Sequence, residues 1–334
     1  MSNNYTSRVA QQIEQYRGIK DIHELPEIFH YWSNKYLRER LNSVIGADSI
    51  AEFYANALIR VAQRQNNHLT FVSLGTGACE VEISVTKALL AKGVDSLKFN
   101  LRCIEISPLL TERAIRNIAE AKLDDYISVT QMDLNDWSPP SDSIDAVIAN
   151  HSLHHMVELE KIFDAVQHSL RKEGAFITND MIGRNGHMRW PEAKVWIDAM
   201  WPMLPEKAKY NNQLKRMEST FLNHDCSNEG FEGIRAQDIL PLLVERFDFE
   251  KFLAYGGLPD IFIDRGFGHN FDASSDSDRG FIDFVQFLND KLIAIGEIKP
   301  TMMFAEMRLR GCSDCRTQYL NLSPEFCIRH TTPD

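Results

Sequence analysis

The stretch "FVSLGTGACEVE", residues 71–82, decides the fold of this chain. An apolar run is interrupted at Ser73, two glycines follow one residue apart, and glutamates appear soon after. Glycine adopts positive φ without steric cost and lets the backbone approach a ligand closely. A strand, a tight glycine turn and a helix start form the usual site for a cofactor that contains adenosine. The stretch therefore predicts such a site at Gly75 and Gly77.

Strand-like and helix-like segments alternate around this turn. "LTFVSL" precedes it and "CEVEISVTKALLAKG" follows it, and the alternation continues to about residue 180. One helix start carries Ser107 as the N-cap and Pro108 at the first helical position. The segment "VELEKIFDAVQHSLRKEG" after the fourth strand predicts a helix that ends at Gly174. Strands joined by crossover helices predict an α/β fold with a parallel, doubly wound sheet.

The residues of the glycine turn also favour one type of adenosine-containing cofactor over another. Gly75-Thr76-Gly77 is followed by Ala78-Cys79-Glu80, so the third glycine of a dinucleotide fingerprint is missing. That glycine permits close helix packing near a pyrophosphate. S-adenosylmethionine has no phosphate, and it is therefore the first hypothesis. NAD or NADP stays open as the alternative, because a lone glycine turn is weak support for either.

Polar residues stand at the ends of the next three predicted strands. Glu105 closes "LRCIE", Asp133 follows "SVTQM" and Asn150 closes "DAVIAN". Open α/β sheets bind ligands at the carboxyl ends of their strands, where an acid can accept hydrogen bonds from ribose hydroxyls. An acid after the third strand can accept from the adenine amine. A single acid after a strand is more often a turn residue or a helix cap, but the ordered series predicts one cofactor site.

On these residues the chain resembles the class I S-adenosylmethionine-dependent methyltransferases, over roughly residues 67–182 and the last two predicted strands. The resemblance implies a Rossmann-like, doubly wound seven-stranded sheet, in which "FEKFLAYGG" and "TMMFAEMRL" form the antiparallel end. It implies cofactor binding by Ser73, Gly75, Thr76, Gly77, Glu105, Ile106, Asp133, Leu134, Asn150 and His151.

The resemblance also implies a role for several of these residues. The glycine turn would pass under the methionine part of the cofactor, Glu105 would bind the ribose, and Asp133 with Leu134 would lie at the adenine. Asn150 would lie near the methionine moiety. Ser73 departs from the family pattern, which often has an acid two residues before the first glycine. A water or the backbone could replace that acid in binding the cofactor's amino group.

The chain divides into five predicted parts. They are an N-terminal helical lid at 1–66, the cofactor-binding core at 67–182, a helical substrate-specificity insert between strands 5 and 6 at 183–247, strands 6 and 7 at 248–310, and a tail at 311–334. Extra N-terminal helices often lie over the cofactor in this fold, where they exclude water.

Methyl transfer depends mainly on holding the nucleophile, carbon and sulfur in line, and a base is needed only for a protonated nucleophile. "NHSLHHM" and "NDMIGRNGHMRWPEA" follow the fourth and fifth predicted strands. They supply His154 and His187 as candidate bases, and Arg189 and Trp190 as candidate substrate-binding residues for a carboxylate. The alternative is that these residues only cap helices or pack. No metal is expected at this site.

The tail offers a possible structural zinc site. Cys312, Cys315, Cys327 and His330 have the spacing C-x2-C-x11-C-x2-H, which resembles that of zinc ligands. The location in a terminal segment with little predicted structure favours unligated thiols, so we expect no zinc there.

Composition limits the partners. The 334-residue chain carries a net charge of −11 and a pI of about 5.5, which disfavours nucleic acid. No apolar run is long enough to cross a bilayer, and the polar N-terminus lacks a signal-peptide core. Six cysteines do not indicate a disulfide scaffold. We expect a cytoplasmic protein with a small-molecule partner, neither nucleic acid nor membrane, and the oligomeric state stays open.

These observations predict a methyltransferase that acts on a small molecule. Oxygen is the first choice of acceptor atom because histidines crowd the predicted site, with nitrogen or sulfur as the alternative. An NAD(P)-dependent oxidoreductase and a non-catalytic S-adenosylmethionine-binding protein are the other hypotheses.

Overall fold

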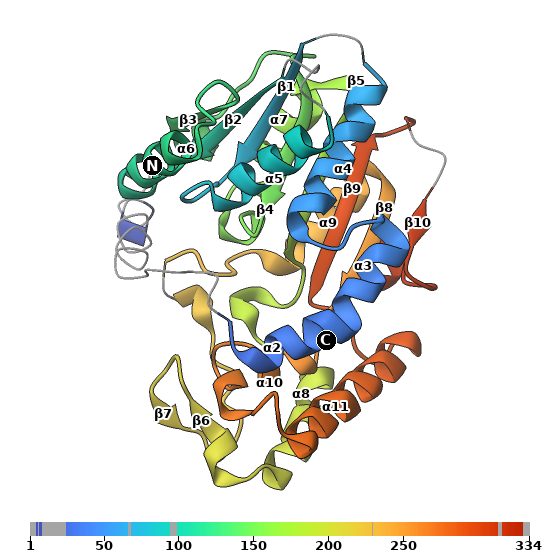
Figure 1. The fold of residues 1–334 in the computed structure, drawn as a ribbon. Helices are drawn as coiled ribbons and strands as arrows, with labels where there is room; N and C mark the ends of the chain where they lie inside the picture. Colours follow the sequence, from blue (N-terminus) through green and yellow to red (C-terminus); the bar gives the residue numbers. More distant parts are fainter. Residues whose placement is uncertain are drawn as a thin grey trace.

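A central mixed sheet organises the computed structural model, which describes residues 5, 7–8, 25–65, 68–93, 99–228, 230–312 and 316–329 (Figure 1). Its strand order is β10-β8-β9-β5-β4-β1-β2-β3. The strands are β1 Leu69–Leu74, β2 Phe99–Glu105, β3 Ile127–Gln131, β4 Ile144–Asn150, β5 Leu170–Met181, β8 Phe247–Tyr255, β9 Met302–Leu309 and β10 Thr317–Gln318. Only β9 runs antiparallel to its neighbours, β5 and β8.

This order confirms the predicted Rossmann-like, mostly parallel sheet with an antiparallel pair at one end. The prediction of seven strands was one short, because β10 pairs in parallel with the edge of β8 at Lys251 and Phe252. A strand of two residues has no hydrophobic alternation from which a sequence pattern could predict it.

The helices begin where capping residues place them. The Ser107 hydroxyl accepts a hydrogen bond from Leu110 N at the start of α6, and Ser275 caps α11 in the same way. The α-helices are α2 Glu27–Trp32, α3 Arg38–Ile45, α4 Ile50–Gln63, α5 Glu80–Ala91, α6 Pro108–Ala121, α7 Leu159–Ser169, α8 Pro191–Met200, α9 Ala236–Arg246, α10 Pro259–Ile263, α11 Asp276–Ala294 and α12 Pro324–Cys327. Short helical turns include η1 Ser33–Leu37, η3 Leu134–Asp136, η4 Leu153–His155, η5 Asn185–His187, η6 Trp201–Met203, η7 Glu206–Lys209, η8 Cys226–Asn228 and η9 Gly268–Asn270.

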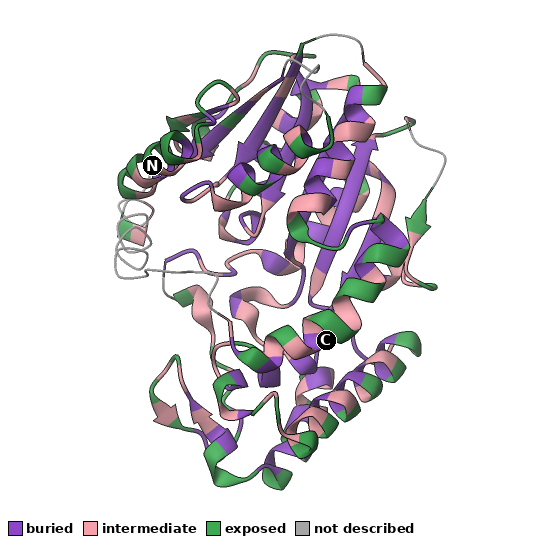
Figure 2. Cartoon of the chain, viewed as in Figure 1, coloured by how far each residue is buried: buried purple, intermediate pink, exposed green. Residues whose placement is uncertain are grey.

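Two layers of helices bury the two faces of the sheet. Helices α4, α5 and α6 cover one face, and α7 and α9 cover the other. The neighbouring residues Phe71 and Val72 of β1 point into the two different cores. Figure 2 shows the central strands as almost continuously buried. Each such apolar side chain contributes about 1.5–3 kcal/mol of burial free energy, so the sheet is a rigid platform for the loops at its ends.

One predicted helix ends earlier than its sequence pattern suggests. We predicted that the helix after the fourth strand ends at Gly174, but α7 ends at Ser169 and β5 begins at the next residue. A Cβ on Gly174 would lie 2.8 Å from the carbonyl oxygen of Asp145. Gly174 is therefore required for the close approach of β5 to β4, not for ending a helix.

A second, mostly helical part lies at the carboxyl end of the parallel strands (Figure 1). Helices α8, α10 and α11 contribute to it, together with a hairpin of β6 Tyr210–Asn211 and β7 Arg216–Met217. The hairpin lies in the region predicted to be helical, residues 183–247. Trp201 and Phe262 are fully buried in this part. Within the described ranges, no helix combines the length and apolarity needed to cross a membrane.

Candidate functional site

The glycine turn after β1 has the conformation that its sequence predicts. Gly75 and Gly77 both have positive φ, 67° and 55°. Gly75 N and Thr76 N donate to Ile104 O, which fixes the turn to β2. A Cβ on Gly75 would lie 2.8 Å from Ser152 Cβ, whereas a Cβ on Gly77 would meet no atom of the described residues within 4 Å. Gly75 is needed for packing, and Gly77 borders open space that a ligand can fill.

These two glycines give a matched pair of variants. We expect Gly75→Ala to lower the free energy of unfolding by about 1–2 kcal/mol more than Gly77→Ala, because only Gly75→Ala adds a steric clash to the φ strain. Gly77→Ala should instead reduce the affinity for S-adenosylhomocysteine. Denaturant unfolding and calorimetric titration measure the two effects. If both variants lost the same free energy of unfolding and bound S-adenosylhomocysteine with the same affinity, these two roles for Gly75 and Gly77 would be wrong.

Glu105 links the glycine turn to the next helix. Its Oε2 accepts a hydrogen bond of 2.8 Å from Gly77 N, and its Oε1 accepts one of the same length from Ser107 N. Burial raises the pKa of this carboxyl group, although the backbone donors act in the opposite direction. Each oxygen keeps a second lone pair for a ligand hydroxyl. Ile106 follows as a half-buried residue.

Asp133 lies after β3 and contacts the N-terminal segment. Its Oδ1 accepts from Asn135 N at 2.9 Å, and its Oδ2 accepts from the Tyr5 hydroxyl at 2.8 Å. The Tyr5 ring packs against the Phe231 ring, and the two ring centroids lie 5.4 Å apart. Leu134 begins the turn η3 beside it and is half-buried. A residue from the N-terminus thus lies at the predicted adenine position.

Ser73 stands where the methyltransferase pattern often has an acid, and in the structure the carboxyl group of Glu82 lies beside it. The Ser73 hydroxyl donates to Glu82 Oε1 at 2.7 Å, across from β1 to the first turn of α5. The other oxygen, Glu82 Oε2, is buried and has no hydrogen-bond partner within the described chain. Burial raises the pKa of Glu82 to about 7. A carboxyl group is thus present beside Ser73, and sequence reasoning missed it although Glu82 belongs to the opening stretch.

A buried hydrogen-bond network holds Asn150 at the end of β4. Asn150 Oδ1 accepts from the Tyr54 hydroxyl of α4 at 3.2 Å and from Asn179 Nδ2 of β5 at 3.4 Å. The Tyr255 hydroxyl of β8 donates to Asn179 Oδ1 at 3.1 Å. Next to Asn150, His151 has a positive φ of 49°, and burial lowers its pKa to about 4. No sequence motif marks Tyr54, Asn179 or Tyr255 as residues of this site.

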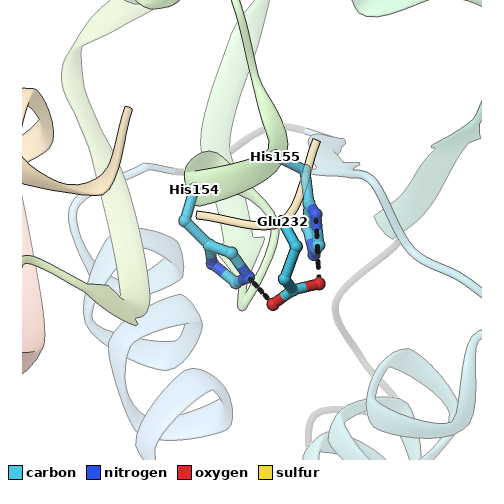
Figure 3. Close-up of side chains that lie close together, drawn as sticks. All are labelled: His154, His155 and Glu232. Atoms are coloured by element: carbon cyan, nitrogen blue, oxygen red, sulfur yellow. Dashed lines mark ion pairs between the residues drawn. The ribbon is translucent and has the colours of Figure 1, made fainter. Parts of the chain in front are cut away.

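The structure brings His154 and His187 together around two carboxylates. His154 Nδ1 donates to Asp180 Oδ1 at 2.6 Å, and its Nε2 lies 3.6 Å from Glu232 Oε1. His187 Nε2 donates to Glu232 Oε1 at 2.6 Å. Figure 3 shows Glu232 with its carboxylate between His154 and His155. Glu232 lies in the predicted insert and carries no sequence signal of its own.

The surroundings of His154 disfavour its predicted role as a general base. Burial lowers its pKa, but the charges of Asp180 and Glu232 outweigh burial and raise it to about 10. Both ring nitrogens face carboxylate oxygens, which hold a proton on the ring, so His154 is a poor acceptor for a substrate proton.

Arg189 and Trp190 are adjacent in sequence but have different partners. Arg189 Nη1 lies 3.7 Å from Asp260 Oδ2. The Trp190 ring stacks with the guanidinium of Arg329, 4.3 Å from the ring centroid, and borders a cavity of about 160 Å³ beside Ile182. Arg189 does not line that cavity, so the two residues do not form a single substrate contact in it.

The predicted zinc ligands of the tail are only partly described. Cys312 forms no disulfide with another described cysteine, and Cys327 is buried in α12. Cys315 and His330 lie outside the described residues, and the expectation for this site stays a prediction.

Comparisons with known proteins point to one family. Residues 81–178 match the family model of the methyltransferase domain. An uncharacterized methyltransferase of Bacillus licheniformis is 23% identical over 205 residues, which are 60% of this chain and 82% of the relative. Among solved structures, a putative sarcosine dimethylglycine methyltransferase from Galdieria sulphuraria is 14% identical with a TM-score of 0.44, covering 77% of this chain and 84% of its own. Another similar structure is that of geranyl diphosphate C-methyltransferase from Streptomyces coelicolor A3(2), solved in complex with Mg²⁺, geranyl diphosphate and S-adenosyl-L-homocysteine. It is 11% identical with a TM-score of 0.44, and the match covers 92% of this chain and 99% of that protein's chain.

Proposed function

We propose, on the premise that this chain is a class I S-adenosylmethionine-dependent methyltransferase, that it methylates a small molecule on an oxygen atom. The observation that carries the proposal is the open space at Gly77, beside polar groups at the ends of β2, β3 and β4. When bound, S-adenosylmethionine supplies a methyl group that its sulfonium charge already activates.

The residues around this space fit that cofactor. We assign the ribose hydroxyls to Glu105 and the adenine to Asp133 with Leu134. We assign the methionine end to the glycine turn, Asn150 and His151. Glu82 Oε2, which is buried and has no hydrogen-bond partner among the described residues, supports a further assignment, because a carboxylate beside Ser73 can accept from the cofactor's amino group. No phosphate has to be accommodated, which agrees with the missing third glycine.

Tyr5 of the predicted N-terminal lid is proposed to cover the cofactor. Tyr5 donates to Asp133 and packs on Phe231, so it joins the predicted adenine position to the insert. A cover of this kind excludes water and holds the reactants in line. Part of the predicted lid has another role, because α4 packs on the sheet and contributes Tyr54 to the network at Asn150.

The choice of oxygen rests on the polar groups at the ends of β4 and β5. His154, His187 and Glu232 gather there, and such groups hold an acceptor hydroxyl by hydrogen bonds. Arg189, which is mostly buried and only loosely paired with Asp260, is assigned to an anionic group of the acceptor. Nitrogen and sulfur acceptors need less help from polar side chains and form the alternative.

Calorimetric titration with S-adenosylhomocysteine and with NAD tests the cofactor assignment. We expect binding of the first and none of the second. The acceptor is then sought by following S-adenosylhomocysteine formation with panels of hydroxyl, amine and thiol compounds. Turnover confined to amines or thiols would overturn the oxygen assignment, and binding of the cofactor without turnover on any panel would favour a non-catalytic binding protein.

A further inference from the structure

Two consecutive histidines of the turn η4 and a glutamate from the loop before α9 converge beside the proposed acceptor position. We propose that His154, His155 and Glu232 form a binding site for a divalent transition-metal ion such as Zn²⁺. One ligand atom from each residue lies within 4.8 Å of the other two, and Figure 3 shows both rings turned toward the Glu232 carboxylate. This is the one such group of three within the described ranges.

The distances are close to those of an occupied site. His154 Nε2 lies 3.6 Å from Glu232 Oε1, and His155 Nδ1 lies 3.8 Å from Glu232 Oε2. Zinc bonds of about 2.0–2.2 Å in tetrahedral geometry place neighbouring ligand atoms roughly 3.4 Å apart. The two nitrogen–oxygen distances exceed that spacing by a few tenths of an ångström, and the three ligand atoms lie within 4.8 Å of one another. Side-chain rotations that move these atoms by about an ångström would therefore bring them to bonding distance of one ion.

The hydrogen bonds that hold these three side chains are of the kind found around metal ligands in proteins. A metal-bound histidine usually donates its other ring N–H to a carboxylate, and this contact orients the ring. His154 Nδ1 makes that contact with Asp180 Oδ1, leaving Nε2 directed toward Glu232. Asp180 is itself fixed, because its Oδ2 accepts from Ser152 N and Leu153 N. His187 Nε2 donates to Glu232 Oε1 and orients the third ligand.

Hydrogen bonds and an ion pair hold the loop that carries Glu232 to two neighbouring segments of the chain. Gly186 N donates to Gly233 O, and the Arg235 guanidinium donates to Val157 O and pairs with Glu160. His187 has a positive φ of 56°, a costly conformation for a residue with a side chain. The loops after β4 and β5 and before α9 are thus held together at the cluster.

The ligand set and the local charge select the type of ion. Imidazole nitrogens with one carboxylate suit Zn²⁺, Fe²⁺ and related ions, whereas Mg²⁺ prefers all-oxygen ligands. Asp180 and Glu232 place two carboxylates around the imidazoles, which attracts a cation. The Glu232 side chain is 33% exposed, so three protein ligands leave coordination positions open toward solvent. An ion there would bind and polarise the acceptor oxygen; that role rests on the proposed function, but the binding of the ion does not.

Metal binding is tested on the full chain, without cofactor or acceptor. Protein freed of metal by a chelator is titrated with ZnCl₂ in competition with a chromophoric chelator. To exclude zinc bound by thiols, the Cys312→Ser/Cys327→Ser double variant is used as the parent. We expect one Zn²⁺ per chain, at least tenfold weaker binding after either His155→Ala or Glu232→Gln, and weaker binding of Mg²⁺.

The control is His30→Ala, which removes an exposed histidine on α2 and should leave affinity unchanged. Thermal unfolding confirms that each variant is folded, and Glu232→Gln is the safer one because it keeps its shape on a partly exposed loop. Absence of zinc binding to the parent would overturn the proposal and leave the cluster as an ion-pair network. Binding that survives both substitutions would overturn it too, since the ion would then lie elsewhere.

Discussion

Replacing Glu105 with alanine is expected to weaken the binding of S-adenosylhomocysteine by about tenfold to 150-fold. Loss of a hydrogen bond to a charged group costs about 1.5–3 kcal/mol, and each 1.4 kcal/mol is a factor of ten. Glu105 is nearly buried, and its oxygens already accept from Gly77 N and Ser107 N. Removing the carboxylate therefore takes away both the proposed ribose contact and the support of the glycine turn. Calorimetric titration measures the change in affinity.

Two further variants separate these contributions. Glu105→Gln keeps the shape and one acceptor oxygen, so its loss of affinity should be smaller than that of Glu105→Ala. Glu112→Ala removes an exposed carboxylate from α6 and should leave affinity unchanged. If folded Glu105→Ala bound S-adenosylhomocysteine as tightly as the parent protein does, the ribose assignment would be wrong.

The parts of the fold that the sequence predicted are those set by local patterns. Ser107 and Pro108 begin α6 as capping and first-turn residues should, and alternating apolar residues placed the strands of the parallel sheet. The end of α7 was mispredicted because Gly174 was taken as a helix terminator. Its actual role is a close contact with Asp145 on a neighbouring strand. Such long-range contacts leave no trace in a local pattern.

The same distinction applies to the site. Glu105, Asp133 and Asn150 could be predicted because a parallel sheet brings the ends of successive strands to one edge. Glu232 could not, since it reaches His154 only through the folding of an insert without a sequence motif. Tyr54 is a comparable case, because the packing of α4 on the sheet decides that its hydroxyl meets Asn150. Where a site contains side chains from an insertion or from a packed helix, their positions can be learned only from a structure.

Glu82→Gln is expected to stabilise the cofactor-free protein by about 3 kcal/mol at pH 8, with little effect at pH 4. Burial raises the pKa of Glu82 from 4.5 to about 7, and 1.36 kcal/mol accompanies each pH unit of that difference. Between pH 4.5 and 7 the unfolded chain loses the Glu82 proton while the folded chain keeps it. The free energy of unfolding therefore falls as the pH rises through this range, and the cost is complete above pH 7.

Glutamine removes this dependence and can still accept the Ser73 hydrogen bond, so the difference between parent and variant isolates Glu82. Urea unfolding at pH 4, 6 and 8 measures it, with Glu112→Gln as the exposed control. S-adenosylhomocysteine supplies a second check. If its amino group meets Glu82, the ligand stabilises the ionised carboxylate, and the variant should bind it more weakly at pH 8. A parent and a variant with parallel stability curves across the three pH values would show that the pKa of Glu82 is the same in the folded and the unfolded chain. The carboxyl group beside Ser73 would then be solvated, and its assignment to the cofactor's amino group would lose its support.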